Sequence, residues 1–217
     1  MKVILSMMLL ASMAVHANEC VELTKCIEYV SKLTGKKYIY DARSVKGGLQ
    51  ASSNLEINAE NADTLFTYIL DLNEYARVPT AEKDTYIIVQ ARDIRYQPVP
   101  TINVDAQTPP KLIPNYDYFM MSYKYKHFKD GQTRMASNSL RPFMSRYSRI
   151  IEVGDTVTVQ ENSAKLAKAY EIIKGTDREL TKEELKRVKE WEAERNEERK
   201  EKRKHDDKKT EKREEKK

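Results

Sequence analysis

Prolines divide this 217-residue chain into two blocks. Five of its seven prolines fall between residues 98 and 114. Because proline fixes φ and has no backbone N–H to donate, such a stretch does not build a helix or a central strand. We therefore expect residues 95–115 to be a semi-extended, Pro-rich linker between two small modules, at 18–94 and 116–176. The prolines concerned are Pro98, Pro100, Pro109, Pro110 and Pro114.

The first residues indicate export. Lys2 precedes an apolar run from Val3 to Val15, which closes on Val15-His16-Ala17. These features are typical of a secretory signal peptide at 1–17, and the run is too short for a stable bilayer-spanning helix. An uncleaved N-terminal anchor is the alternative. A lipoprotein is not expected, because Cys20 lacks the small apolar box that lipidation needs.

The chain has two cysteines, Cys20 and Cys26, in what should be an oxidising compartment. Two cysteines that lie six positions apart within one helix have their sulfurs too far apart to bond. A disulfide therefore requires Cys20 to precede the helix that carries Cys26. Two free thiols and an intermolecular bridge are the alternatives. The pair lacks a CxxC spacing and a histidine partner, so we expect no metal or redox site there.

Apolar periodicity predicts the elements of the first module. Between residues 21 and 33 the spacing is helical, and Gly35 stands where a helix ends. In a second helix, Leu65, Phe66, Ile69 and Leu72 are expected to face inward. The predicted order is a helix at 21–33, strands at 36–40 and 49–53, a helix at 61–72, and strands at 76–78 and 86–90.

The second module shows a different order. An alternating aromatic stretch predicts a strand within 116–125, and a helix is expected at 135–147 despite Pro142. Gly154-Asp155 predicts a hairpin between strands at 149–153 and 156–160. Asn162 or Ser163 should cap a last helix through 173. The expected inward face of that helix consists of Leu166, Ala169, Tyr170 and Ile173. The predicted fold class is therefore α+β: two small mixed α/β sandwich modules joined by the linker.

Residues 177–217 form a charged tail. The chain carries 34% charged residues and a formal net charge of +5. Thr181 to Glu184 is a capping box, and Leu185, Val188 and Trp191 give a faint apolar edge. Pairs of opposite charge at helical spacing can support a solvated helix, but they cannot build a core. We expect a helical or disordered tail.

Several short stretches of both modules match a known family. The helix ending in Val30-Ser31-Lys32, the strand closing on Asp41 and the Val45-Lys46-Gly47 turn are similar to the secretin and TonB short N-terminal domain. The repeated, KH-like secretin domain has a helix and a strand that resemble Leu140-Arg141-Pro142-Phe143-Met144 and Asp155-Thr156-Val157-Thr158-Val159. Both modules thus resemble the periplasmic N-terminal domains of secretins, the outer-membrane channels of bacterial secretion systems and type IV pili.

The resemblance implies a periplasmic, non-enzymatic protein-binding component or accessory of a type II secretion or pilus system. The implied partners are a secretin channel or an inner-membrane platform protein, with self-association into a ring. Strand addition at a sheet edge would supply the contacts. A TonB-type signalling module is an alternative, although those receptors use the short domain alone.

The chain departs from the family in two ways. The family's first strand precedes the first helix, but signal cleavage leaves almost no chain for it, so an open sheet edge is expected. The family's large channel domain has no counterpart in these 217 residues, where the charged tail follows instead. We therefore do not expect this chain to form a pore by itself.

Enzymatic chemistry is not expected. His127 and His205 have no nucleophile partner, Asp206-Asp207 belongs to the tail, and no phosphate loop or metal-ligand spacing occurs. We predict no catalytic, cofactor-binding or metal-binding residues, no cofactor and no small-molecule substrate, and the sequence nominates no protein-binding residues.

A nucleic-acid-binding protein of DNA uptake is the remaining alternative. Its basis is a set of tyrosines interleaved with lysines, because aromatic rings stack bases and cations hold phosphates. Against it, a KH-like site needs a Gly-x-x-Gly loop, which is missing, and acids in the tail offset most of its basic charge. Nucleic acid is therefore not an expected partner. The residues are Tyr116, Tyr118, Tyr123, Tyr125, Lys124, Lys126 and Lys129.

Overall fold

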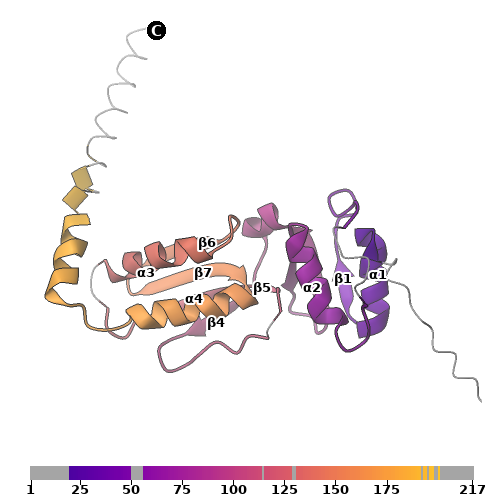
Figure 1. Ribbon diagram of the computed structural model, residues 1–217, viewed down its shortest axis with the longest axis horizontal. Helices are drawn as coiled ribbons and strands as arrows, with labels where there is room; N and C mark the ends of the chain where they lie inside the picture. Colours follow the sequence, from indigo (N-terminus) through magenta and orange to yellow (C-terminus); the bar gives the residue numbers. More distant parts are fainter. Residues whose placement is uncertain are drawn as a thin grey trace, which may run out of the picture.

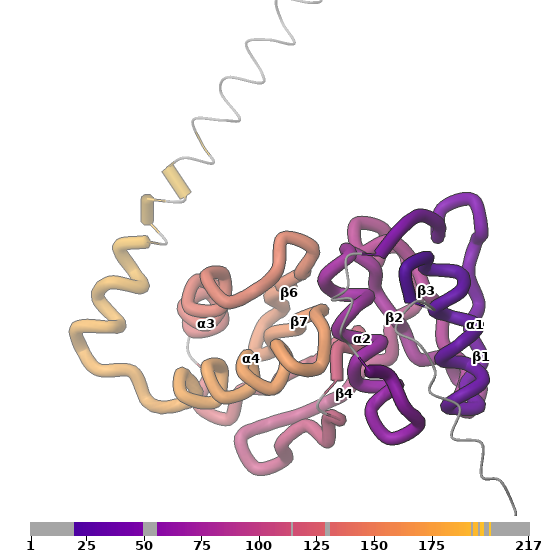
Figure 2. Tube along the Cα trace, turned by 45° about the vertical axis from the view of Figure 1, so that its right-hand side comes forward, coloured from indigo at the N-terminus to yellow at the C-terminus, as the bar shows by residue number. Residues whose placement is uncertain are grey.

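The computed structural model describes residues 20–49, 56–113, 115–128 and 131–191, together with 193, 194, 196, 197 and 200. The predicted signal peptide, nearly all of the strand predicted at 49–53, Lys129, His205 and Asp206-Asp207 lie outside the described residues. Figures 1 and 2 show two α+β modules side by side along the long axis of the molecule. The predicted fold class is confirmed.

The first module packs two helices on one face of a three-stranded sheet. The helices are α1 (Leu23–Thr34) and α2 (Ala62–Leu72), and the strands are β1 (Lys37–Ile39), β2 (Tyr75–Pro79) and β3 (Thr85–Gln90). The sheet order is β1-β3-β2, with β1 parallel and β2 antiparallel to β3. As predicted, Gly35 ends α1 in the left-handed conformation, with φ of 71°.

The inward face of α2 differs from the prediction at its C-terminal end. Phe66, Ile69 and Leu70 are buried, whereas Leu72 is 53% exposed. Each residue turns a helix by about 100°, so Leu72 lies about 200° around the axis from Leu70 and cannot share its contacts. The hydrophobic spacing alone could not decide between Leu70 and Leu72.

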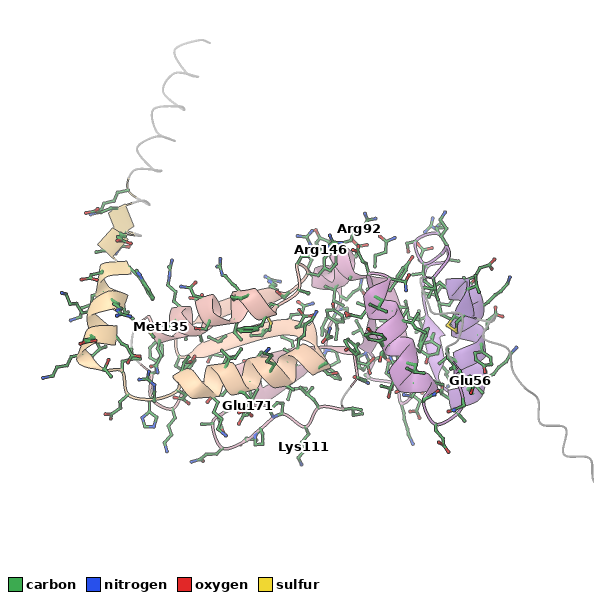
Figure 3. All side chains as sticks on the ribbon, in the orientation of Figure 1. Glu56, Arg92, Lys111, Met135, Arg146 and Glu171 are labelled. Carbon is green, nitrogen blue, oxygen red and sulfur yellow. A yellow bond between two sulfur atoms is a disulfide. The ribbon has the colours of Figure 1, made fainter. Side chains whose placement is uncertain are left out.

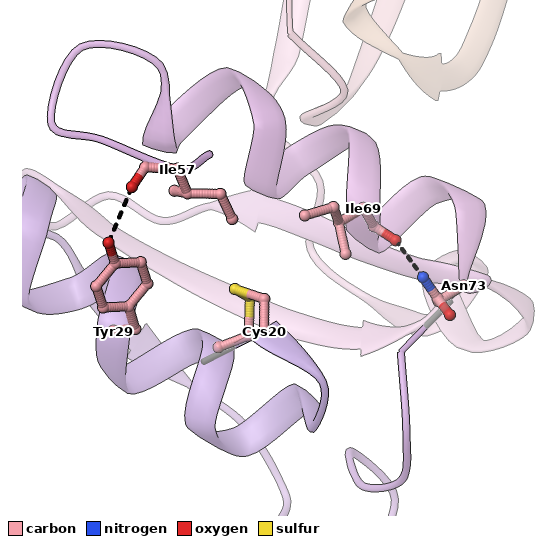
Figure 4. Close-up of a disulfide and its surroundings, with 6 residues drawn as sticks. Cys20, Tyr29, Ile57, Ile69 and Asn73 are labelled. Atoms are coloured by element: carbon pink, nitrogen blue, oxygen red, sulfur yellow. Dashed lines mark hydrogen bonds between the residues drawn. A yellow bond between two sulfur atoms is a disulfide. The ribbon is translucent and has the colours of Figure 1, made fainter. Parts of the chain in front are cut away.

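The disulfide closes the start of the first module. Cys20 and Cys26 are bonded, with their Cα atoms 4.2 Å apart, and both side chains are buried in the core between the helices (Figure 4). Cys20 precedes α1, as a bond between these positions requires. The chain just before α1 is paired as well, since Glu22 and Gly48 form an antiparallel bridge. Within the described residues, this bridge stands where the family places its first strand.

The second module packs two helices on a four-stranded sheet of order β4-β5-β7-β6. Strand β4 is parallel to β5, and the remaining pairs are antiparallel. Asn162 caps α4, because its side chain accepts a hydrogen bond of 3.0 Å from the N–H of Lys165. The predicted inward face of α4 is buried throughout. The elements are β4 (Thr101–Val104), β5 (Tyr118–Lys124), α3 (Gln132–Leu140), β6 (Arg149–Val153), β7 (Thr156–Asn162) and α4 (Ser163–Thr176).

Prolines account for two departures in this module. The helix predicted at 135–147 ends at Leu140 and continues only as the 3-10 turn η3 (Arg141–Phe143), because Pro142 has no N–H to donate to the preceding turn and its ring crowds the carbonyl four residues back. The segment predicted as a linker contains β4. That strand lies at a sheet edge, where nearby prolines are tolerated, and the carbonyl of Pro100 accepts a bond of 2.8 Å from Met120.

The first part of the tail is tied to the second module. Asp177 is buried and accepts hydrogen bonds from the Tyr123 hydroxyl (2.9 Å) and from the backbone N–H groups of Lys126 and His127. The predicted capping box is present, since Thr181 N–H donates to Glu184 at 2.9 Å. Residues 182–191 are helical and lie at the end of the second module remote from the first (Figure 1). Among the described residues, no helix has the length and apolar character needed to cross a membrane.

Candidate protein-binding edges and the junction between the modules

A buried arginine joins the two modules. Arg77 of β2 is 1% exposed and forms a parallel β-bridge with Asp117, the residue just before β5. Its Nε and Nη2 donate to the two carboxylate oxygens of Asp117, and its Nη1 donates to Asp63 of α2 at 2.6 Å. The Tyr86 ring lies 4.3 Å from the guanidinium carbon. Two carboxylates and an aromatic face thus surround one buried cation.

The electrostatics of this cluster favour the charged state of Arg77. Burial by itself would lower the pKa of the guanidinium, but the hydrogen bonds and charges of Asp117 and Asp63 outweigh burial and raise it. Burial likewise would raise the pKa of Asp63, yet the neighbouring Arg77 and Lys36 lower it. The junction is therefore a bidentate ion pair in a largely dry environment.

Apolar packing and further hydrogen bonds extend the junction around this ion pair. Tyr118 of the second module is buried in one cluster with Ala76, Val78 and Ile94 of the first. Gln160 donates to the Ile94 carbonyl at 3.0 Å. Asn162 donates to Asp71 at 3.2 Å, and Tyr116 N–H to the Thr67 hydroxyl at 3.2 Å. The second module is therefore held in a fixed position relative to the first.

The outer edge of β1 is the candidate binding edge of the first module. Strand β1 is the terminal strand of its sheet, and no described strand pairs with its outer side. Lys37 N–H already donates inward to Asp84, so the alternation of the ladder turns the N–H and C=O of Tyr38 outward. The Tyr38 ring is anchored against Phe66, whereas Ile39 is 57% exposed beside Ile87. An apolar side chain thus accompanies backbone groups that no described strand pairs with.

The second module has edges of its own at β4 and β6. Val153, the last residue of β6, is 69% exposed next to the Gly154 turn. No described strand lies beyond β6. Exposed apolar residues on an edge strand are a recognised route to pairing between chains.

The structure does not bring the sequence-predicted nucleic-acid residues together as a stacking surface. Tyr118, Tyr123 and Tyr125 are buried, and the Tyr116 ring packs against Tyr68 with ring centroids 5.4 Å apart. The tyrosines alternate because they fill the core and the junction. In the described part of the chain, no group of three or more His, Cys, Asp or Glu side chains could hold a metal ion.

Sequence reasoning missed the residues of the junction. Arg77 lies in a short strand and Asp117 follows forty residues later, so only the fold brings them together. In the sequence, Arg77 between Ala76 and Val78 fits the ordinary alternation of a half-exposed strand, so no local signal indicated its burial.

Comparison with known proteins supports the resemblance read from the sequence. A family model described as "GspD-like, N0 domain" matches residues 18–86. The resemblance to secretin N-terminal domains is confirmed. No curated protein sequence is significantly similar to the chain.

Solved structures extend the comparison to both modules. In the outer-membrane complex of the type II secretion system of Klebsiella pneumoniae, which contains PulD, PulS and the PulC HR domain, the match has a TM-score of 0.55 at 18% identity. It covers 73% of this chain and 26% of that chain, and it shows a shared fold.

Two further matches have lower TM-scores. The N-terminal domain of the secretin XcpQ from Pseudomonas aeruginosa matches at 16% identity over 75% of this chain and 64% of that one, with a TM-score of 0.28. The GspC-GspD complex of enterotoxigenic Escherichia coli matches at 16% identity over 72% and 92%, with a TM-score of 0.26. The chain therefore spans less than two thirds of the XcpQ domain and about a quarter of the matched chain in the PulD complex.

Proposed function

We propose that this chain is a periplasmic, non-enzymatic protein-binding component of a type II secretion system. The observation that carries the proposal is the open edge of β1 in a module that matches the GspD-like N0 domain. A partner strand laid along β1 would pair with the backbone groups of Tyr38 and would cover Ile39.

The partner of the first module would be a secretin channel or an inner-membrane platform protein. Support comes from the similar fold in the complex that contains PulD, PulS and the PulC HR domain. The second module would pack against neighbouring copies through the edge of β6, so that chains associate into a ring. The rigid junction at Arg77 would fix the angle between the two binding edges.

Two variants with the same chemical change separate these roles. Ile39→Lys and Val153→Lys each add one charge at an exposed apolar position on an edge strand, and neither position belongs to a core cluster. Charged residues on edge strands oppose pairing with another strand. Circular dichroism and thermal melts would first verify that both full-length variants fold like the wild type.

Cross-linking of intact envelopes, followed by affinity purification and mass spectrometry, provides the test. We expect Ile39→Lys to lose a secretin or platform protein that the wild type recovers, while it keeps homomeric cross-links. Val153→Lys should show the opposite pattern. Recovery of the same partner in equal yield by wild type and Ile39→Lys would contradict the proposal.

A further inference from the structure

A cationic cleft lies at the junction, away from the edge of β1, and the first residue of β6, Arg149, belongs to its lining. It has a volume of about 710 Å³, within the range of about 300–1,000 Å³ typical of ligand sites. Figure 3 shows two of its arginines, Arg92 and Arg146, next to each other where the modules meet. Its lining consists of Arg92, Arg95, Tyr96, Arg146, Tyr147, Ser148 and Arg149.

One wall of the cleft is built by η2 (Ala91–Tyr96), a 3-10 helix. With three residues per turn, positions three apart share a face. Ala91 and Ile94 are buried, so Arg92 and Arg95 project together from the opposite side. Tyr96 follows them and is 73% exposed. Since Gln160 of β7 donates to the Ile94 carbonyl, this wall is fixed to the second module.

The other wall is the turn that leads into β6. The N–H of Ser145 donates to the buried Glu161 at 2.8 Å, and the Tyr147 ring packs against the apolar cluster of the junction. These contacts hold Arg146 and Arg149 toward η2. Both walls are thus anchored before any ligand arrives, which lowers the entropic cost of binding.

The cleft holds more positive charge than its surroundings neutralise. Arg146 is paired with Glu74, and Arg92 has only a distant contact of 3.9 Å with Asp93. Among the described residues, no carboxylate lies within ion-pair distance of Arg95 or Arg149. Three arginines therefore have unused capacity to bind an anion.

One contact at the rim of the cleft already joins an arginine and a tyrosine to a carboxylate. The Glu74 carboxylate accepts hydrogen bonds from Arg146 and, at 2.8 Å, from the Tyr147 hydroxyl. A second hollow of about 290 Å³, lined in part by Glu74, Arg92 and Tyr147, continues from this pair. The carboxylate of Glu74 is thus bound by an arginine and a tyrosine at the rim of the cleft. The neighbouring residues Arg95 and Tyr96 place the same two residue types across the cleft.

We propose that this cleft is a second binding site, which takes an acidic peptide segment of a partner protein. Successive carboxylates would bind Arg92, Arg95 and Arg149, and guanidinium groups suit carboxylates because they donate two parallel hydrogen bonds. The site goes beyond the binding edge of β1, and its test does not require that edge to function.

The test measures binding of fluorescein-labelled hexaglutamate to the full-length protein by fluorescence anisotropy. The variant Arg95→Glu/Arg149→Glu reverses two unpaired charges of the cleft. Its matched control, Lys83→Glu/Lys111→Glu, makes the same change in net charge at two exposed lysines outside the cleft. Lys111 lies on the opposite side of the molecule in the view of Figure 3. Hexaglutamine of equal length, oligothymidine and inorganic phosphate serve as competitors.

We expect hexaglutamate to bind wild type and the lysine control alike, and the arginine variant to bind it roughly tenfold more weakly or worse, as loss of charge-assisted hydrogen bonds predicts. Ile39→Lys should bind the peptide as wild type does, so a failure of the β1 edge would remain distinguishable. Equal binding by the arginine variant and the lysine control would overturn the proposal. So would displacement of the peptide by oligothymidine or phosphate at lower concentrations than unlabelled hexaglutamate, because the cleft would then be a phosphate site.

Discussion

Asparagine can replace Asp117 with almost no change in volume, which isolates the contribution of its charge to the junction. In the wild type this carboxylate pairs with both Nε and Nη2 of the buried Arg77. The substitution leaves the guanidinium buried with only Asp63 as a carboxylate partner. Breaking a buried pair in this way costs about 3–5 kcal/mol. Because Asp63 remains, we expect a loss of about 3 kcal/mol in the free energy of unfolding, at the lower end of that range.

For a folded unit of this size, 3 kcal/mol corresponds to a fall in Tm of roughly 6–12 °C. Thermal melts and urea titrations followed by circular dichroism would measure it at neutral pH. Asp41→Asn is the control, because Asp41 pairs with Arg43 in the same bidentate way but on the surface. We expect no measurable shift for the control, since exposed pairs contribute little.

A double variant tests the physical reasoning further. Arg77→Met alone should be costly because it leaves Asp117 buried without its cation. Combining Arg77→Met with Asp117→Leu removes both charges, so the double variant should be more stable than the sum of the single losses implies. A loss for Asp117→Asn no larger than for Asp41→Asn, or strict additivity in the cycle, would refute the role assigned to this ion pair.

Three further predictions concern the rest of the fold. Cys20→Ser/Cys26→Ser should lose about 2 kcal/mol, as closure of so short a loop predicts, and dithiothreitol should lower the Tm of the wild type but not of this variant. Because the fold lowers the pKa of Asp63, its ionised carboxylate stabilises the protein at pH values above the ordinary aspartate pKa, and this stabilisation is lost as the pH falls through the lowered value. The difference in Tm between wild type and Asp63→Asn should therefore be largest at neutral pH and shrink below about pH 4. A difference that does not change with pH would contradict this. Asp177→Asn should lower the free energy of unfolding by about 2 kcal/mol, because the carboxylate accepts hydrogen bonds from a buried hydroxyl and two N–H groups. Truncation after residue 191 should leave the Tm unchanged. An equal loss of stability in both variants would show that the tail stabilises the fold as a whole.

Local patterns were sufficient to predict most elements of the two modules. The inward face of α4 and its Asn162 cap depend only on residues within a few positions of each other, and the structure confirms both. The glycine cap of α1 is equally local. Periodicity and capping are properties of short segments, so they can be read without knowledge of the tertiary fold.

Features that depend on distant residues could not be predicted in the same way. Strand β4 is only four residues long and lies between prolines, so its β-branched residues did not mark it as part of a sheet until its pairing with β5 was known. The first residue of the predicted tail, Asp177, is a buried carboxylate that anchors Lys126 and His127, and the prediction that the tail builds no core could not foresee this contact.

The arginine cleft shows the same limit for a binding site. Its residues come from two segments, Arg92 to Tyr96 and Arg146 to Arg149, each an ordinary arginine-tyrosine stretch in the sequence. These two segments line the same cleft only because the fold places η2 beside the turn before β6. Electrostatic sites at a junction between modules thus require the fold before they can be recognised.

The central claim, that the open edge of β1 binds a partner protein, is tested most directly by photo-cross-linking in living cells. A photoreactive amino acid would replace Ile39 at this edge, and a control would carry it at the exposed Glu171 of α4 in the second module. We predict that position 39 yields a covalent adduct with a secretin or an inner-membrane platform protein and that position 171 does not. Absence of any adduct from position 39, or the same adduct in equal yield from position 171, would contradict the account.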